Sequence, residues 1–471
     1  EVKISLRAPK DPKCERIKYD WAKYAENAGL RYEYEVEVAN RYNILNAECL
    51  HADDNSRVQI MYDNFERSIE GATKKLVSRA KRTKRNWVTP ETCALIKDRD
   101  KAKAQYKRKR TDETKSLWKE LNKKLDAAYV NDDVSYLEST LAMMTEAARC
   151  NRMRTTWKLI NEVSGKQQTS SLSKIKKKDG LPYTTPAELL YNWKTYFSDL
   201  LNVCPIQLAH SPPIQPAKHD LNIEVGPITV DEVAEAISQL KLGKAPGLDS
   251  NVTPEALRYG GNWIAEQLTE LFNAIIDQGA APRQFTTSLI SPIPKKGDLS
   301  QMSNYRGISL MSHAAKLFNM VILNRIKDSV DELLRPNQAG YRTGRSCIDQ
   351  IHIIRTILAG ANEKQLPLFI TFIDFLKAFD SINREKMFQI LRHYGIPAKI
   401  VDAIRLIYKD SRSSVLIEGK VTDDFPVTTG VLQGDTLAPL LFIIVIDFVM
   451  KNAVRDGIVE QNVKTTRRPS S

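Results

Sequence analysis

The sequence has little of what marks secreted, zinc-bound or membrane-spanning proteins. Its 471 residues include six cysteines, which lie far apart and form no Cys-x-x-Cys pair. A disulfide framework or a structural zinc site is therefore not expected, and a reducing, intracellular compartment fits the chain. No signal peptide pattern is visible. The longest apolar run, residues 440–450, contains Asp447 and is far shorter than the ~20 residues of a membrane span, so no membrane partner is expected.

Negative charge is also in short supply, because 57 Asp and Glu face 70 Lys and Arg and the net charge is +13. Much of the excess lies in residues 71–110, where 15 basic side chains accompany 3 acidic ones. So dense a basic block favours a polyanionic partner, nucleic acid above all, although a solvated charged helix face is the alternative. The candidate cations for this contact are Lys81, Arg82, Lys84, Arg85, Lys107, Arg108, Lys109 and Arg110.

Residues 11–165 have the pattern of successive helices and include the basic block. Thr89 is suited to cap a helix that begins at Pro90. Charges of both signs alternate after that start, and apolar residues are too sparse for a deep core, so we predict one extended helix that lies on the surface.

The composition and the apolar pattern of the sequence change after residue 165. A polar linker occupies the start of residues 166–225, and the spacing of apolar residues then predicts an amphipathic helix over 185–202, opened by Thr185. From residue 226 loops, short apolar strands and helices alternate, which is typical of an α+β fold.

Asp374 ends an apolar segment of strand length. Residues 368–373 are aliphatic or aromatic, which predicts a buried strand, and the pattern after Asp374 predicts a helix. A carboxylate where a buried strand meets a turn can hold a divalent ion such as Mg²⁺ in a cleft. A turn or cap aspartate is the alternative, and for an isolated Asp it is the more common one.

A second candidate segment spans residues 425–450. Gly430 and Gly434 flank Gln433, and an apolar helix is predicted from Pro439. A glycine beside a glutamine lets the main chain approach a ligand while the side-chain amide hydrogen-bonds to it. An ordinary loop before a core helix is the alternative.

Five segments together resemble the motifs of reverse transcriptases from LINE-type (non-LTR) retrotransposons. DFLKAFD, residues 374–380, is similar to motif A of these enzymes, and GVLQGDTLAPLLF, residues 430–442, is similar to motif B. Residues 241–261, 289–311 and 334–351 resemble the family's entry segment, its fingers motifs and its Q-x-G-F-R-x-G-R-S element. The five follow one another in the family's order. The resemblance implies an RNA-directed DNA polymerase with an RNA template, a DNA primer and dNTPs as partners, in the nucleus and cytoplasm.

The resemblance also implies an organisation for the chain. Residues 226–350 would be the fingers of a right-hand polymerase and residues 351–456 an incomplete palm, preceded by the mostly helical basic region. Residues 1–10 would be the end of an endonuclease domain, and residues 457–471 a divergent tail.

Roles follow from the resemblance position by position. Asp374 would bind two Mg²⁺ ions, with the main-chain carbonyl of Phe375 as a further ligand. Phe379 would stack under the sugar and exclude a ribose 2′-hydroxyl, although a core phenylalanine is the alternative.

Further contacts are implied for the nucleotide and the template. Lys295 and Arg306 would contact the triphosphate, with plain solvent-exposed charge as the alternative. The remaining residues would bind the nucleotide or template (Gln433, Gly434) and the template backbone (Arg342, Arg345).

Some features depart from the family's pattern. Gly307 stands where proline is usual, and Ala438 where serine is usual. The second catalytic motif, Tyr/Phe-Ala-Asp-Asp, is expected after residue 450, where the sequence has no Asp-Asp. Thr-Asp-Asp at 422–424 is predicted at the tip of a hairpin. We therefore expect this polypeptide to have little or no polymerase activity.

Three hypotheses follow: a degenerate or truncated polymerase domain, a non-catalytic nucleic-acid-binding remnant that uses the basic block, and a basic helical interaction protein. The first requires one geometric arrangement. Asp374 should end a buried strand and face the turn at residues 433–434 across a gap the size of a nucleotide.

Overall fold

The computed structural model describes residues 19–47, 54–79, 87–164, 175–177, 180–181, 183, 185–202, 213–249, 251–295, 297–375 and 377–454. It separates into a smaller unit, Ala80–Ser171, and a larger unit formed by the rest of the chain. The predictions for residues 1–10 and 457–471, and for Lys81, Arg82, Lys84 and Arg85, lie outside the described residues.

The smaller unit consists of α4 (Pro90–Lys109), α5 (Asp112–Arg149) and α6 (Met153–Val163). The predicted start of α4 is confirmed, because the Thr89 side chain accepts a hydrogen bond from the main-chain N–H of Thr92. The single extended helix predicted after it is wrong. The chain reverses at Arg110, which has a left-handed φ of 49°, and Thr111 caps the next helix. The physical reason is this second capping sequence, Thr111 followed by acidic residues, in the middle of the charged run.

Helices α4 and α5 pack side by side in opposite directions. Near the reversal, Tyr106 and Trp118 stack with ring centroids 5.7 Å apart. At the other end of the pair, the carboxylate of Asp132 accepts the main-chain N–H of Thr89 at 2.9 Å. The cations 107–110 are exposed at the end of α4, so this face of the hairpin stays open to solvent.

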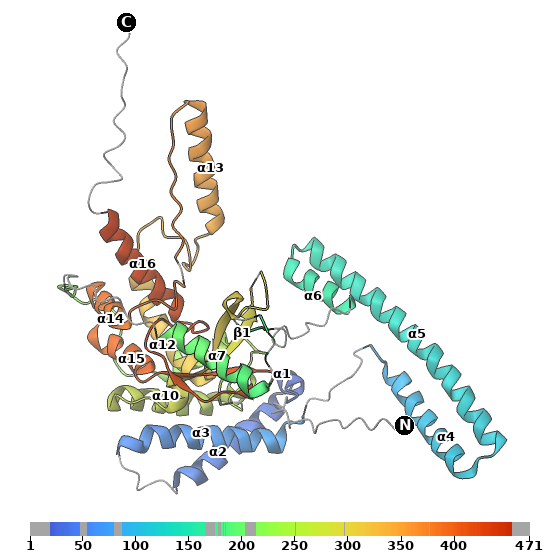
Figure 1. The fold of residues 1–471 in the computed structure, drawn as a ribbon. Helices are drawn as coiled ribbons and strands as arrows, with labels where there is room; N and C mark the ends of the chain where they lie inside the picture. Colours follow the sequence, from blue (N-terminus) through green and yellow to red (C-terminus); the bar gives the residue numbers. More distant parts are fainter. Residues whose placement is uncertain are drawn as a thin grey trace. The chain divides into compact units, whose positions relative to one another are not determined.

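The core of the larger unit is a cluster of helices packed around aliphatic and aromatic side chains. Figure 1 shows α2 and α3 beneath α10, and the three helices share this core. The N-terminal helices therefore belong to the larger unit. The helices concerned are α1 (Ala22–Glu26), α2 (Ala28–Ala47), α3 (Asp54–Leu76), α8 (Val230–Gln239), α9 (Pro254–Tyr259), α10 (Gly261–Gln278), α12 (His313–Asp331), α14 (Arg384–His393), α15 (Ala398–Tyr408) and α16 (Ala438–Val454).

A mixed five-stranded sheet forms the other half of the larger unit. Strand β1 (Thr287–Pro294), which follows the short helix α11 (Arg283–Thr286), pairs antiparallel with β2 (Tyr305–Leu310) and parallel with β3 (Arg412–Ile417). β3 also pairs antiparallel with β4 (Lys420–Val421) and β5 (Phe425–Pro426). The β3–β4 turn is at residues 418–419, so the predicted hairpin tip at 422–424 is wrong. Mixed helices and strands agree with the α+β prediction.

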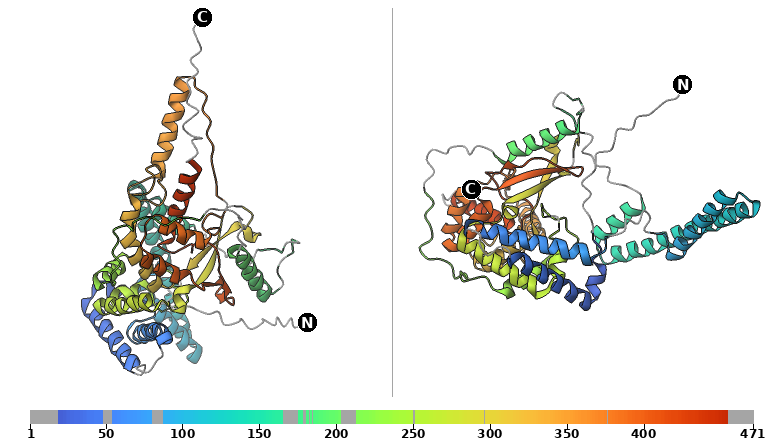
Figure 2. Two further views of the ribbon diagram at one scale, coloured as in Figure 1. Left: turned by 90° about the vertical axis from the view of Figure 1, so that its left-hand side faces the viewer. Right: turned by 90° about the horizontal axis from the view of Figure 1, so that it is seen from below.

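Helix α7 (Pro186–Leu201) lies across this sheet, as Figure 2 shows. Its predicted cap is confirmed, because the Thr185 side chain accepts the main-chain N–H of Glu188. Its apolar face carries Trp193 and Phe197, which are buried in a second core against the strands. The predicted amphipathic helix over 185–202 is therefore confirmed.

Helix α13 (Cys347–Glu363) and the segment after it are the most exposed apolar part of the larger unit. Figures 1 and 2 show residues 366–375 returning beside this helix as an extended chain. The predicted buried strand over 368–373 is wrong, since Phe369 is 93% exposed and Phe372 82% exposed. No strand in the described part of the chain pairs with this segment, so its backbone lacks the hydrogen-bonded ladder that a strand needs.

The structure also bears on two expectations from the sequence, one about membrane-spanning helices and one about cysteines. Within the described residues, no helix has the length and apolar character needed to cross a membrane. Cys93, Cys150 and Cys347 are free and exposed, and the other three cysteines lie outside the described residues.

Candidate functional site

The end of motif A docks on the start of motif B. The main-chain N–H of Val431 donates to the carbonyl of Phe379 at 2.9 Å, and that of Gly430 donates to the carbonyl of Ile382 at 2.8 Å. Gly430 has a φ of 78°, and a Cβ there would lie 2.7 Å from the Cα of Asp380. Only glycine allows both the left-handed conformation and this close approach.

Gln433 is held from two sides. Its main-chain carbonyl accepts the N–H of Ser309, on β2, at 2.7 Å. Its side-chain Nε2 donates to Oδ1 of Asp380 at 2.7 Å. Gly434 follows with a φ of 123°, and a Cβ there would lie 2.5 Å from the carbonyl oxygen of Ser309. The glutamine turn is therefore fixed between β2 and motif A.

A buried arginine donates hydrogen bonds to the main chain of the same loop. Arg384, at the start of α14, donates to the carbonyls of Gly430 at 2.9 Å and Val427 at 2.7 Å, and to the hydroxyl of Ser411 at 2.7 Å. Burial lowers the pKa of Arg384 to about 10. Its guanidinium satisfies carbonyls of an irregular loop that would otherwise be buried without partners.

The charges around Asp380 are mainly positive. Burial raises the pKa of Asp380, and the hydrogen bond from Gln433 opposes that rise. The charges of three cations oppose it further: Lys377, Lys295 and Arg306. Lys295 and Arg306 are exposed at the far end of the β1–β2 hairpin. The junction of motifs A and B is thus a basic region with one partly buried carboxylate.

Phe379 is partly buried beside this junction. Its ring stacks on Phe442 of α16, with centroids 4.5 Å apart, and meets the edge of Tyr341 at 5.9 Å. The Phe379 ring thus packs against one partly buried ring, Phe442, and one exposed ring, Tyr341. That Phe379 stacks under the sugar and excludes a ribose 2′-hydroxyl stays a prediction.

Helix α7 forms one wall of a pocket at the junction. Phe197 and Leu200 line it together with Asp380, Gln433 and Ser309. Gly307 lines it too, and a Cβ there would lie 2.7 Å from the Phe197 ring. A side chain at 307 would therefore force the Phe197 or Ile290 side chain to shift.

Asp374 and Phe375 are both exposed, on the extended segment beside α13. The arrangement that the polymerase hypothesis required is wrong in its first part, because Asp374 ends no buried strand. The carboxylate that contacts Gln433 is that of Asp380. The polymerase hypothesis therefore rests on the sequence motifs and not on this geometry. Among the residues that the structure describes, no group of three or more His, Cys, Asp or Glu side chains is placed to hold a metal ion. The described residues alone therefore do not form a site for two metal ions.

Arg342 and Arg345, the two candidate template residues, differ in how accessible their side chains are. Arg342 is bound within the fold, because its guanidinium holds the Asp331 carboxylate at 2.7 and 2.8 Å and also donates to main-chain carbonyls. Its side chain is 5% exposed. Arg345 is exposed. Template contact stays a prediction for both, and Arg345 is the one with an accessible side chain.

A buried polar cluster joins the family's entry segment to the helical core. The Oδ2 atom of Asp249 accepts the hydroxyl of Tyr62, on α3, and that of Ser312 at 2.6 Å. Burial raises the pKa of Asp249 to about 7. Gly247 lies so close to the main chain at Met311 that a Cβ would be 2.7 Å away. The glycine and aspartate of the entry segment thus anchor the start of α12.

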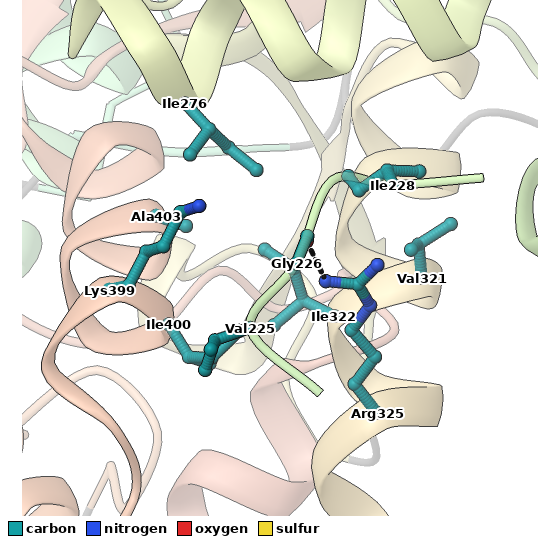
Figure 3. Close-up of a pocket in the computed structure, with 10 residues that line it drawn as sticks. All are labelled: Val225, Gly226, Ile228, Ile276, Val321, Ile322, Arg325, Lys399, Ile400 and Ala403. Carbon is teal, nitrogen blue, oxygen red and sulfur yellow. Dashed lines mark hydrogen bonds between the residues drawn. The ribbon is translucent and has the colours of Figure 1, made fainter. Parts of the chain in front are cut away.

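Figure 3 shows a second pocket, which is lined mainly by aliphatic side chains around Arg325. Arg325 donates to both carboxylate oxygens of Glu232, at 2.6 and 2.7 Å, and to the carbonyl of Gly226 at 2.9 Å. The donors of Arg325 are engaged within the fold. Arg325 therefore stabilises the fold at this pocket and is not available to bind a ligand.

Asp380 is the site residue that the sequence reasoning missed. The sequence pattern predicts Asp380 within the helix after Asp374, whereas the structure has turns at residues 377–381 and begins α14 at Arg384. Gly430 was a signal that some backbone approaches closely at this point. The sequence could not show that the approaching residue is Asp380.

Known proteins are similar in sequence to this part of the chain. Residues 293–459, which include both loops, match the family model described as reverse transcriptase (RNA-dependent DNA polymerase). The chain carries a reverse transcriptase domain.

Its relatives identify the kind of reverse transcriptase. The chain is 31% identical over 228 residues to the probable RNA-directed DNA polymerase from transposon BS of Drosophila melanogaster, covering 47% of this chain and 25% of the relative. It is 28% identical to the Pol polyprotein of retrotransposable element R2DM from the same fly, over 45% of this chain and 20% of the relative. The fly X-element polymerase is 23% identical over 83% of this chain and 43% of the relative. The domain is of the LINE-type, non-LTR retrotransposon class, and the chain spans less than half the length of these relatives.

Proposed function

We propose that this chain forms the fingers and the first part of the palm of an RNA-directed DNA polymerase. Its partners would be an RNA template, a DNA primer and dNTPs. The observation that best supports this proposal is the junction of residues 379–382 with residues 430–434, beside the exposed cations Lys295 and Arg306. A pocket lined by Gln433 and Asp380, with the charges of Lys295 and Arg306 acting on Asp380, suits a nucleoside triphosphate.

The proposed triphosphate contacts use exposed cations. Lys295 and Arg306 would bind the triphosphate, since Arg offers two parallel N–H donors to a phosphate. Gln433 and Gly434 would contact the nucleotide or the template base. Arg345 is our preferred residue for the template backbone, because Arg342 is engaged with Asp331.

Divalent metal ions belong to the proposed chemistry. When bound, two Mg²⁺ ions would lower the charge on the triphosphate and stabilise the attacking and leaving oxygens. In this chain Asp374 and the carbonyl of Phe375 are the proposed ligands. They supply too few ligands for two ions, so the isolated polypeptide of 471 residues should extend a primer little or not at all.

Primer extension on an RNA template, with dNTPs and Mg²⁺, tests the proposal. The 471-residue polypeptide is compared with a chimera in which the Asp-Asp strand of a relative follows residue 450. We expect the chimera to extend the primer, Asp374→Ala to abolish extension, and the exposed-site control Asp402→Ala to leave it unchanged. Extension that survives Asp374→Ala would contradict the proposed role of Asp374. No extension by the chimera would contradict the polymerase proposal, and clear extension by the original chain would contradict only the expected inactivity.

The exposed cations of the smaller unit support a second contact. Lys107, Arg108, Lys109 and Arg110 lie together at the reversal between α4 and α5, with no acidic residue among them. We propose that they bind the phosphate backbone of template or target without reading its sequence. If only this salt-sensitive binding is found and no extension by the chimera, the reading of a non-catalytic binding remnant is favoured instead.

A further inference from the structure

We propose that Asp380 is a positioning residue, which holds one amide N–H of Gln433 so that the carboxamide oxygen of Gln433 is presented to the bound nucleotide. This inference rests on the proposed nucleotide site and specifies what one of its residues offers to the ligand. The contact that carries it is the hydrogen bond of 2.7 Å from Nε2 of Gln433 to Oδ1 of Asp380.

The chemistry of the pair sets the orientation of the amide. An ionised carboxylate only accepts hydrogen bonds, whereas the glutamine side chain has one accepting and one donating end. The donating end must therefore face Asp380. The oxygen of the amide is then left as an acceptor for a donor on the ligand, such as a sugar hydroxyl or a base N–H.

Both partners are held on rigid main chain. Asp380 lies between Phe379 and Ile382, whose carbonyls accept the main-chain N–H groups of Val431 and Gly430. Gln433 is tied to β2 through Ser309. Neither residue can shift without breaking these bonds, so the side-chain contact is preorganised before a ligand arrives.

The charge of Asp380 argues against direct contact with phosphate. A carboxylate beside a triphosphate would repel it, and Asp380 is already partly buried and engaged by Gln433. The surrounding cations, Lys295, Arg306 and Lys377, are the groups suited to the phosphates. Asp380 is therefore placed to act through Gln433.

The test measures binding of dTTP with Mg²⁺ to the 471-residue chain by calorimetry. Asp380→Ala frees the glutamine amide and should weaken binding about fivefold to tenfold, the effect of one lost hydrogen bond. Asp380→Asn keeps the shape and an accepting oxygen, so it should stay within about threefold of the wild type. Gln433→Ala should weaken binding at least as much as Asp380→Ala.

A double-mutant cycle separates positioning from other roles. If Asp380 acts through Gln433, Asp380→Ala adds no further loss in the Gln433→Ala background. Additive losses would overturn the inference, because Asp380 would then act independently of the glutamine. If Asp380→Ala fails to fold, as a thermal melt would show, Asp380→Glu replaces it. This variant keeps the charge but displaces the carboxylate, so positioning predicts weaker binding and a purely electrostatic role predicts no change.

The proposed function can fail separately. Arg306→Ala and Lys295→Ala remove the proposed triphosphate contacts and leave the Asp380–Gln433 pair in place. If they weaken dTTP binding while Asp380→Ala does not, the positioning role falls and the nucleotide site stands. If the wild-type chain binds no dTTP, or if neither cation matters, the nucleotide site itself falls and the positioning role with it.

Discussion

The turn at residues 430–434 and the segment at residues 366–375 are the two parts of the predicted site. They differ in how far the rest of the fold holds them in place. The turn is irregular and rich in glycine, yet β2, motif A and Arg384 hold it by hydrogen bonds. The segment has strong strand propensity, yet it is extended and exposed, with Ile373 67% accessible.

The difference shows that order here depends on partners more than on local propensity. Several backbone groups of the turn, among them the N–H groups of Gly430 and Val431 and the carbonyls of Gly430 and Gln433, find partners within the described residues. A strand instead needs a neighbouring strand for its whole ladder, and β propensity expresses packing against neighbours more than a preference of the single segment. No such neighbour is present among the described strands.

The largest effect that would test this comparison is the loss of Arg384. Arg384→Met should destabilise the larger unit by ~3–5 kcal/mol, because several buried carbonyls lose a charged donor. Hydrogen exchange at the main-chain amides of Gly430 and Val431 should become much faster. The control is Arg405→Met, at a half-exposed side chain on α15. Unchanged exchange in Arg384→Met would mean that the turn is ordered by other contacts.

The next effect concerns the polar cluster at Asp249 and depends on pH. Its pKa is raised to about 7 by burial, so the folded state binds this proton more tightly than the unfolded chain. Stability from this group is present at pH 4 and is lost as the pH rises to about 7. The free energy of unfolding of the wild type, relative to Asp249→Asn, should therefore fall by roughly 2–4 kcal/mol across this range.

Urea unfolding at several pH values measures this difference. The exposed-site control Asp402→Asn should show no comparable trend relative to the wild type. A wild-type protein that gains stability relative to Asp249→Asn as the pH rises would show that Asp249 is ionised and favourably held in the fold.

A smaller effect sharpens the comparison directly. Leu432→Ala, in the turn, removes a buried side chain and should cost ~2–4 kcal/mol. Phe372→Ala removes a larger but 82% exposed side chain and should stay within ~0.5 kcal/mol. Chemical denaturation of both variants, monitored by circular dichroism, gives the two values. A large loss in Phe372→Ala would break the comparison, since the segment would then be packed in solution.

The smallest effect lies in the other unit. Replacing Lys107, Arg108, Lys109 and Arg110 by Ser should weaken binding of a short RNA about tenfold at moderate salt and make the dependence on salt shallower. A matched variant loses four exposed lysines of the larger unit: Lys218, Lys327, Lys399 and Lys409. Fluorescence anisotropy at several salt concentrations measures both. Equal losses in the two variants would point to net charge instead of a localised binding surface.

Local signals in the sequence predicted local structure well. Thr89 and Thr185 each cap a helix as the sequence predicted, because a cap needs only residues three positions apart. The helix from motif B is present as α16. The reversal at Arg110 was missed, although Thr111 and the acidic residues after it carried the same signal.

The sequence by itself determined several helices and their caps, the mixed fold class and the reverse transcriptase motifs, because these depend on neighbouring residues or on a resemblance of short segments. Only the tertiary structure decided that Asp380 holds Gln433, that Arg342 is engaged with Asp331, and that residues 368–373 are not a buried strand. Each of these depends on which distant segment supplies a partner. Side-chain pairs and strand ladders form between segments that the chain brings together, and periodicity along one segment contains no information about the other.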